Sequence, residues 1–147
     1  MKAFLTGATA AMAFLAFSAF AREHTALNGT WTLVPTKSDF AGQPVIQSGT
    51  VTINEREGNI SVSRNFVYHG ATGTSYYSDS IDGKNNATIH RDGDVKSKAR
   101  WDHDVLTVTT TQSGATTVEN YSLAADGTMM VKVERPEQRA FTLGFVR

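Results

Sequence analysis

The sequence predicts an all-β protein, a single antiparallel up-and-down β-barrel of about eight to ten strands. Turn signals recur along the chain, centred near positions 58, 71, 83, 93, 103, 113, 126 and 137. The segments between them alternate apolar and polar residues, and none shows the period of an amphipathic helix. Such spacing is typical of consecutive antiparallel strands joined by hairpins.

The first strand is expected in residues 27–33, where a glycine that can turn the chain sharply precedes Trp31. Residues 35–47 contain two prolines and a glycine, so they are expected to form a loop with room for at most one helical turn. We interpret Asp82-Gly83 as a hairpin turn. The strands expected in this half cover residues 51–53, 60–68, 76–81 and 87–91.

The second half of the chain has the clearest alternation. In residues 95–101, small or apolar side chains alternate with the basic row Lys96, Lys98 and Arg100, which is expected to form a solvated outer face. Asp126-Gly127 is another hairpin signal. The remaining strands are expected near residues 106–109, 118–123, 129–133 and 141–145.

Closure into a barrel is favoured over a two-sheet sandwich. A flat meander of ten strands would leave two unpaired edges, which closure removes. A sandwich usually needs longer Greek-key connections, and residues 35–47 are the only long loop in the sequence.

Residues 1–21 are interpreted as a signal peptide, and residues 22–147 as one barrel domain. Lys2 precedes an apolar stretch that is short for a membrane span, and Ala19-Phe20-Ala21 fits a signal-peptidase site. The alternative is a retained N-terminal anchor. We expect a periplasmic or secreted protein with no stable membrane insertion after processing.

Composition excludes some functions. Removing residues 1–21 takes away one of the 14 Lys and Arg and none of the 14 Asp and Glu, leaving 13 against 14. Near-neutrality argues against a nucleic-acid partner, which requires a basic excess. The sequence has no cysteine, and a domain of this length can fold without disulfides. We expect a monomer.

The string Leu27-Asn28-Gly29-Thr30-Trp31-Thr32-Leu33, combined with the strand pattern, resembles the calycin superfamily of lipocalin-like and fatty-acid-binding-protein-like barrels. With Pro35, Lys37, Ser38 and Phe40, it is most similar to secreted bacterial lipocalin-like proteins. The resemblance implies that Trp31 packs near the closed end of the barrel under a basic residue. Residues 35–47 are too short for the two-helix lid of fatty-acid-binding proteins, so the resemblance covers the barrel alone.

Strand counting selects the basic residue. If successive turns alternate between the two ends, the last strand returns to the end at which the first begins, and it brings Arg147 close to Trp31. We expect a cation–π contact there, with Arg139 as the second choice. The alternative is a frayed C-terminal arginine.

The sequence predicts no metal site, no cofactor and no enzymatic activity. The acidic residues around turns 93 and 103 belong to opposite ends of one strand, roughly 25 Å apart at about 3.3 Å per residue. Asp side chains there are interpreted as turn-forming. No Gly-x-Ser-x-Gly or other nucleophile motif is present.

Arg64 is the main candidate for a polar ligand contact, because it shares the apolar face of its strand. An inward arginine needs a partner, since an unpaired charge in a core is costly. The partner is either a ligand carboxylate or one of two internal acids, Asp79 and Glu119. A bulge after Val62 that turns Arg64 outward is the third possibility.

Two functions follow. The first is a non-enzymatic protein that binds a small hydrophobic or amphipathic molecule inside the barrel, at the end that carries loop 35–47. The second is a filled barrel that acts by protein contact, for example as a hydrolase inhibitor, with residues 22–28 as an arm that reaches into the partner. The predicted ligand-binding residues are Arg64, Phe66, Tyr68, Tyr77, Trp101, Met129 and Phe141.

Overall fold

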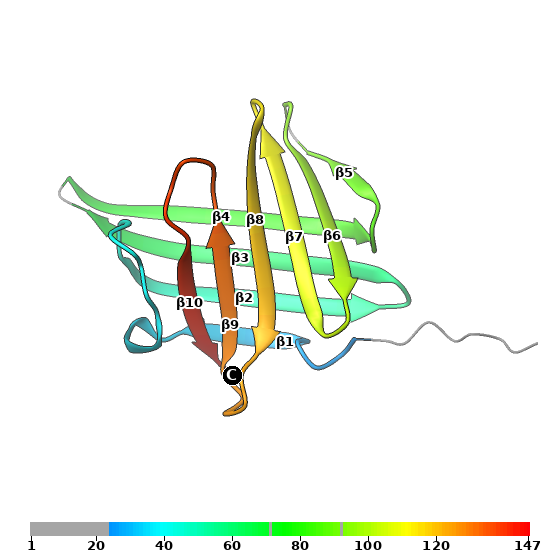
Figure 1. Cartoon of the computed structure of the whole chain (residues 1–147), viewed down its shortest axis with the longest axis horizontal. Coiled ribbons are helices and arrows are strands. Elements are labelled where there is room, and N and C mark those ends of the chain that lie inside the picture. Colours follow the sequence, from blue (N-terminus) through cyan, green and yellow to red (C-terminus); the bar gives the residue numbers. More distant parts are fainter. Residues whose placement is uncertain (1–23, 71, 92) are drawn as a thin grey trace, which may run out of the picture.

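The computed structural model describes residues 24–70, 72–91 and 93–147, and residues 1–21 therefore lie outside the described part. Ten antiparallel strands form one sheet that curls into a nearly closed barrel, as predicted (Figure 1). The only helical element in the described residues is the 3-10 turn η1 (Pro35–Lys37). The strands are β1 (Gly29–Leu33), β2 (Ile46–Arg56), β3 (Asn59–Gly70), β4 (Gly73–Lys84), β5 (Thr88–His90), β6 (Lys96–Asp102), β7 (Val105–Gln112), β8 (Ala115–Leu123), β9 (Met129–Glu134) and β10 (Phe141–Val146).

The sheet has the order β4-β3-β2-β1-β10-β9-β8-β7-β6-β5, so the first and last strands lie side by side in its centre. Leu33 pairs with Phe145, which confirms that the meander returns to its start. Strands β2–β4 run across β6–β9 in Figure 1 because the sheet folds over on itself. Edge strands β4 and β5 approach each other, but they are not neighbours in the described ladder.

The predicted hairpin at Asp82-Gly83 is wrong. Strand β4 continues through both residues to Lys84, and the chain turns afterwards at Asn86, whose φ is 60°. The glycine serves a close approach rather than a turn: a Cβ on Gly83 would lie 2.6 Å from Cδ1 of Ile89. Strand β4 is therefore longer than its turn signal indicated, and β5 packs against its end.

Loop 34–45 joins β1 to β2 and lies against β10. Val34 N–H donates to the Gly144 carbonyl at 2.8 Å, and Asp39 forms an isolated antiparallel bridge with Thr142. Phe40 packs against the core. We call the end that carries this loop the loop end, and the opposite end, where β1 begins, the Trp31 end.

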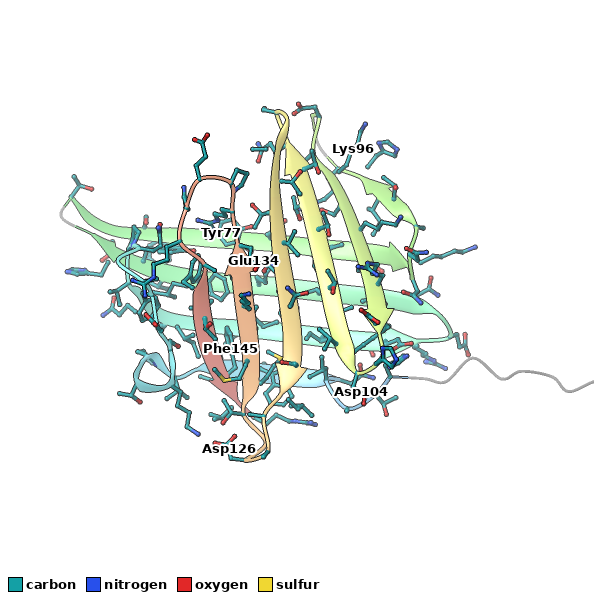
Figure 2. All side chains as sticks on the ribbon, viewed as in Figure 1. Tyr77, Lys96, Asp104, Asp126, Glu134 and Phe145 are labelled. Atoms are coloured by element: carbon teal, nitrogen blue, oxygen red, sulfur yellow. The ribbon has the colours of Figure 1, made fainter. Side chains whose placement is uncertain are left out.

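The hydrophobic core fills the Trp31 end. Trp31, Ile53, Leu106, Met129 and Phe145 are all at most 1% exposed. Figure 2 places Asp104 and Asp126 together at this end and Lys96 toward the other, so successive connections alternate between the ends. None of the helical segments in the described part of the chain is long and apolar enough to span a membrane.

Arg147 lies over Trp31, with its guanidinium carbon 4.4 Å from the ring centroid. Its Nη2 donates to the Ala26 carbonyl at 2.7 Å, and its Nη1 to the Asn28 carbonyl at 3.3 Å. Gly29 beside it has a φ of +129°, a backbone conformation that residues with a side chain rarely adopt. The pair marks the Trp31 end as the closed end of the barrel.

Candidate functional site

A cavity of about 600 Å³ occupies the barrel interior toward the loop end. Seven strands contribute to its wall, since inward-facing side chains of β2–β4 and β7–β10 reach it. Its lining comprises Ile46, Arg64, Phe66, Tyr68, Tyr77, Ser78, Asp79, Arg91, Val95, Thr110, Gln112, Thr117, Glu119, Val133, Arg135, Phe141 and Leu143.

Five of the seven predicted ligand-binding residues line this cavity: Arg64, Phe66, Tyr68, Tyr77 and Phe141. The other two face inward but lie at the Trp31 end. Trp101, next to the β6–β7 turn, lines a separate pocket of about 360 Å³. Met129, the first residue of β9, is fully buried in the core. The alternation of apolar and polar residues gave the correct strand face for both residues, but not their position along the barrel axis.

Aromatic rings form one wall of the cavity. The Phe66 ring stacks on Tyr77 with centroids 6.1 Å apart, and it meets Tyr68 edge-on at 6.4 Å. Gly49 on β2 makes room for it, because a Cβ there would lie 2.4 Å from Cδ1 of Phe66. Sequence reasoning missed Gly49, although a glycine inside a strand is a known signal of close approach.

Arg64 points inward and pairs with both internal acids that the sequence offered as partners. Its Nη2 donates to Asp79 Oδ2 at 2.8 Å, and its Nη1 forms a short ion pair with Glu119. Asp79 lies directly opposite on β4, whereas Glu119 comes from β8, so the side chain of Arg64 bridges the barrel interior. The Nε of Arg64 is buried and has no hydrogen-bond acceptor among the described residues.

Arg91 completes the charged cluster. It follows β5 and forms an ion pair with Asp79, with Nη1 donating to Oδ2 at 3.1 Å. This pair bridges the two edge strands of the sheet, which do not pair through their backbones in the described ladder. The sequence analysis did not identify Arg91, because its role exists only once the sheet has curled.

Arg64, Asp79, Arg91 and Glu119, which we call the ionic floor, separate the cavity from the packed core. On β3, β4 and β8, the residues two positions closer to the Trp31 end than Arg64, Asp79 and Glu119 are completely enclosed. They are Val62, Ile81 and Tyr121, each at most 1% exposed. The ionic floor and its lining neighbours therefore mark the depth to which the barrel is hollow.

Two tyrosine hydroxyls also donate to the carboxylates of the ionic floor. Tyr121 donates to Glu119 Oε2 at 2.8 Å, and Tyr77 donates to Asp79 Oδ2 at 3.0 Å. Burial, followed by the charge of Glu119, raises the pKa of Tyr121 well above its ordinary value. Tyr121 is therefore a protonated donor at neutral pH.

The charge of Arg64 is secure. Burial works against the charged guanidinium, but interactions with Tyr121 and Glu119 outweigh it and raise the pKa of Arg64 above its ordinary value. Nearer the mouth, burial raises the pKa of Tyr68, so its hydroxyl is also protonated at neutral pH. Arg135 lies there with its guanidinium carbon 5.5 Å from the centroid of Phe141, and it is exposed.

The N-terminal segment packs on the barrel instead of projecting from it. The His24 ring stacks on Trp101 with centroids 4.4 Å apart, and its backbone N–H donates to Glu55. Leu27 is buried and accepts a hydrogen bond from the Trp31 indole at 2.8 Å. Residues 24–28 thus close the Trp31 end. Arg22 and Glu23, the first residues of the arm considered above, lie outside the described part.

In the described part of the chain, no three His, Cys, Asp or Glu side chains gather into a group that could hold a metal ion. His103 hydrogen-bonds its neighbour Asp102 at 2.9 Å on the surface. Asp92 lies outside the described residues.

No family model and no curated protein matches this sequence. Solved structures match in fold. The fatty-acid-binding protein of Schistosoma mansoni, in complex with arachidonic acid, has a TM-score of 0.61 at 16% identity, over 84% of this chain and 97% of that one. A SAHS protein from Ramazzottius varieornatus has a TM-score of 0.62 at 11% identity, over 83% and 95%.

The wild-type fluorescent protein UnaG has a TM-score of 0.60 at 15% identity, over 82% of this chain and 96% of that one. The fold is thus that of the fatty-acid-binding-protein-like and lipocalin-like barrels.

Proposed function

We propose that this chain is an exported, non-enzymatic protein that holds one small hydrophobic or amphipathic molecule in the cavity at the loop end of its barrel. The observation that carries the proposal is the cavity itself, about 600 Å³ between an aromatic wall and the ionic floor. Small-molecule sites span roughly 300–1,000 Å³ and combine apolar walls with a few fixed polar groups.

The proposed ligand contacts are aromatic along the wall, and the ionic floor lies beneath the ligand. Phe66, Tyr68, Tyr77 and Phe141 supply apolar surface against which a hydrocarbon chain or ring packs. Arg64 borders the inner end of the ligand. The arachidonic acid complex of the Schistosoma mansoni protein supports a lipid-like ligand, because its barrel has the same fold.

A protein-contact function is the second candidate, and two observations weigh against it. A filled barrel has no cavity of this size. The arm that such a function requires is held down from residue 24 onward by His24, Leu27 and Arg147.

Export rests on the leader-like residues 1–21. Expression in the native host followed by N-terminal sequencing of the protein from the periplasm or medium should give a chain that begins near Arg22. Recovery of the full-length chain from the cytoplasm alone would remove export from the proposal.

Binding of a neutral fluorescent phenylnaphthylamine probe tests the proposed function. The wild type should bind the probe one to one, and Thr117→Phe, which adds a ring inside the cavity, should weaken binding at least about tenfold. Thr109→Phe is the matched control, because Thr109 lies on the neighbouring strand between the inward-facing Val108 and Thr110. Equal affinity of the two variants would contradict binding in this cavity.

A further inference from the structure

The ionic floor borders the inner end of the cavity, so its charges act on the end of a ligand that reaches it. We infer that the cavity selects amphiphiles whose polar end is uncharged, such as alcohols or esters, over the same hydrocarbon chain ending in a carboxylate. The inference rests on the proposed function and names the ligand class of that site. An inward arginine considered alone suggests the opposite, a ligand with a carboxylate.

The charges of the ionic floor balance. Two guanidinium groups, Arg64 and Arg91, face two carboxylates, Asp79 and Glu119. Arg64 engages both carboxylates, one through each terminal nitrogen, and its Nε, which has no acceptor among the described residues, is buried rather than open to the cavity.

The carboxylates are equally engaged. Asp79 accepts from Arg64, from Arg91 and from the Tyr77 hydroxyl. Glu119 accepts from Arg64 and from the Tyr121 hydroxyl. Apart from Arg64 Nε, which is buried without an acceptor among the described residues, the ionic floor is therefore a connected network whose charged groups are directed at one another rather than at the cavity.

A ligand carboxylate at this depth adds a third negative charge beside two existing ones. To replace either ion pair of the Arg64 terminal nitrogens it must displace Asp79 or Glu119, whose side chains are only 8% and 10% exposed. A displaced Glu119 would be a buried charge without its cation, which is strongly unfavourable, and a displaced Asp79 would keep only Arg91 of its two cations. An alcohol or ester has no charge to place there.

Arg135 does not reverse this preference. It is the one charged residue in the described lining outside the ionic floor, and it lies exposed at the mouth. Solvent screens an ion pair at such a position, so the pair contributes little to binding. Neutral groups line the remaining wall, among them the hydroxyls of Tyr68 and Thr117 and the amide of Gln112, and these groups suit a hydroxyl or carbonyl oxygen.

The test compares three ligands of one chain length: palmityl alcohol, methyl palmitate and palmitic acid, each titrated at neutral pH against the bound phenylnaphthylamine probe. The alcohol and the ester should displace the probe at concentrations at least about tenfold lower than the acid. Glu119→Gln removes one negative charge and leaves the ionic floor with a net positive charge. That variant should bind the acid at least about tenfold better relative to the alcohol than the wild type does.

Two further variants keep the result interpretable. Asp79→Asn makes the same change of charge and replaces Glu119→Gln if the latter does not fold. Glu134→Gln is the matched control, because it removes one charge from the partly exposed residue that pairs with Lys132, outside the cavity lining, and it should leave the selectivity unchanged.

The possible outcomes distinguish the selectivity inference from the proposed binding function. Tighter binding of the acid than of the alcohol and ester by the wild type would overturn the inference and leave the proposed function standing. Selectivity that does not respond to either ionic-floor variant would also overturn it. Failure of the wild type to bind the probe and all three ligands would remove the proposed function, and the inference with it.

Discussion

Replacing Arg64 with leucine removes the cation at the centre of the ionic floor while keeping an inward side chain of moderate size. In the variant, Asp79 still has Arg91 and Tyr77, but Glu119 keeps only the Tyr121 hydroxyl. The side chain of Glu119 is 10% exposed, so water compensates its charge poorly.

The magnitude follows from that stranded carboxylate. Removing one partner of a buried ion pair costs about 3–5 kcal/mol. For a domain of this length, the loss corresponds to a decrease in Tm of about 10–20 °C. Urea denaturation monitored by tryptophan fluorescence, with thermal unfolding in parallel, measures both quantities.

The double variant Arg64→Leu with Glu119→Leu identifies the mechanism. It removes the stranded charge together with the cation, so it should recover at least about half of the stability lost in the single variant. Arg100→Leu, on the exposed face of β6, is the matched control and should change stability by less than about 0.5 kcal/mol. A single-variant loss below about 1 kcal/mol, or a double variant no more stable than the single one, would refute the reasoning.

Three other predictions concern single contacts. Gly49→Ala places a Cβ 2.4 Å from Cδ1 of Phe66, so it should destabilise the fold by about 1–3 kcal/mol in urea and reduce probe binding; an unchanged midpoint would contradict the close approach. Arg147→Ala removes the cation–π contact and two hydrogen bonds to backbone carbonyls, so it should cost about 1–2 kcal/mol, and no measurable loss would show a frayed terminus. Asp126→Ala should lower the Tm at pH 7 by clearly more than at pH 2, because hydrogen bonds from Thr128 lower the pKa of Asp126 from 3.8 to about 2. Because the folded-state pKa of Asp126 is depressed, its contribution to stability is fully present above about pH 3.8 and is lost as the pH falls through about 2. An equal decrease in Tm at both pH values would contradict this prediction.

Matched controls accompany two of these predictions. Arg139→Ala removes a second exposed arginine near the C-terminus and should not reproduce the Arg147 effect. Ser48→Ala, next to Gly49 on β2, adds no atom facing the cavity and should leave probe binding unchanged.

Local patterns predict the strand order and the side-chain faces well. Period-two alternation places Arg64, Phe66 and Tyr68 on the inner face of β3, and the structure shows all three in the cavity lining. Turn spacing predicts the return of the last strand to Trp31, since a meander that closes must end beside its first strand.

Alternation contains no information about height within the barrel. Trp101 and Met129 have the same inward pattern as the cavity residues, yet both lie at the Trp31 end, because each adjoins a turn at that end. Assigning each inward residue to a level between the two ends would have placed both at the Trp31 end, outside the cavity.

Two of the three ion pairs of the ionic floor exist only in the curled sheet. Arg64 and Asp79 are cross-strand neighbours, and a register argument reaches that pair. Glu119 meets Arg64 across the interior, and Arg91 meets Asp79 across the gap between the two edge strands. Similarly, the signal at Asp82-Gly83 was misread because the packing of Ile89 on Gly83 lies outside any local window.

Native mass spectrometry of the protein purified from its own host tests the central claim most directly. The account predicts a complex of one chain with one small lipid-like molecule, which dissociates on collisional activation and is absent from Thr117→Phe. Its extracted ligand should be an uncharged amphiphile. A wild-type protein that carries no such molecule, and that takes up neither the probe nor palmityl alcohol when these are added, would contradict the account.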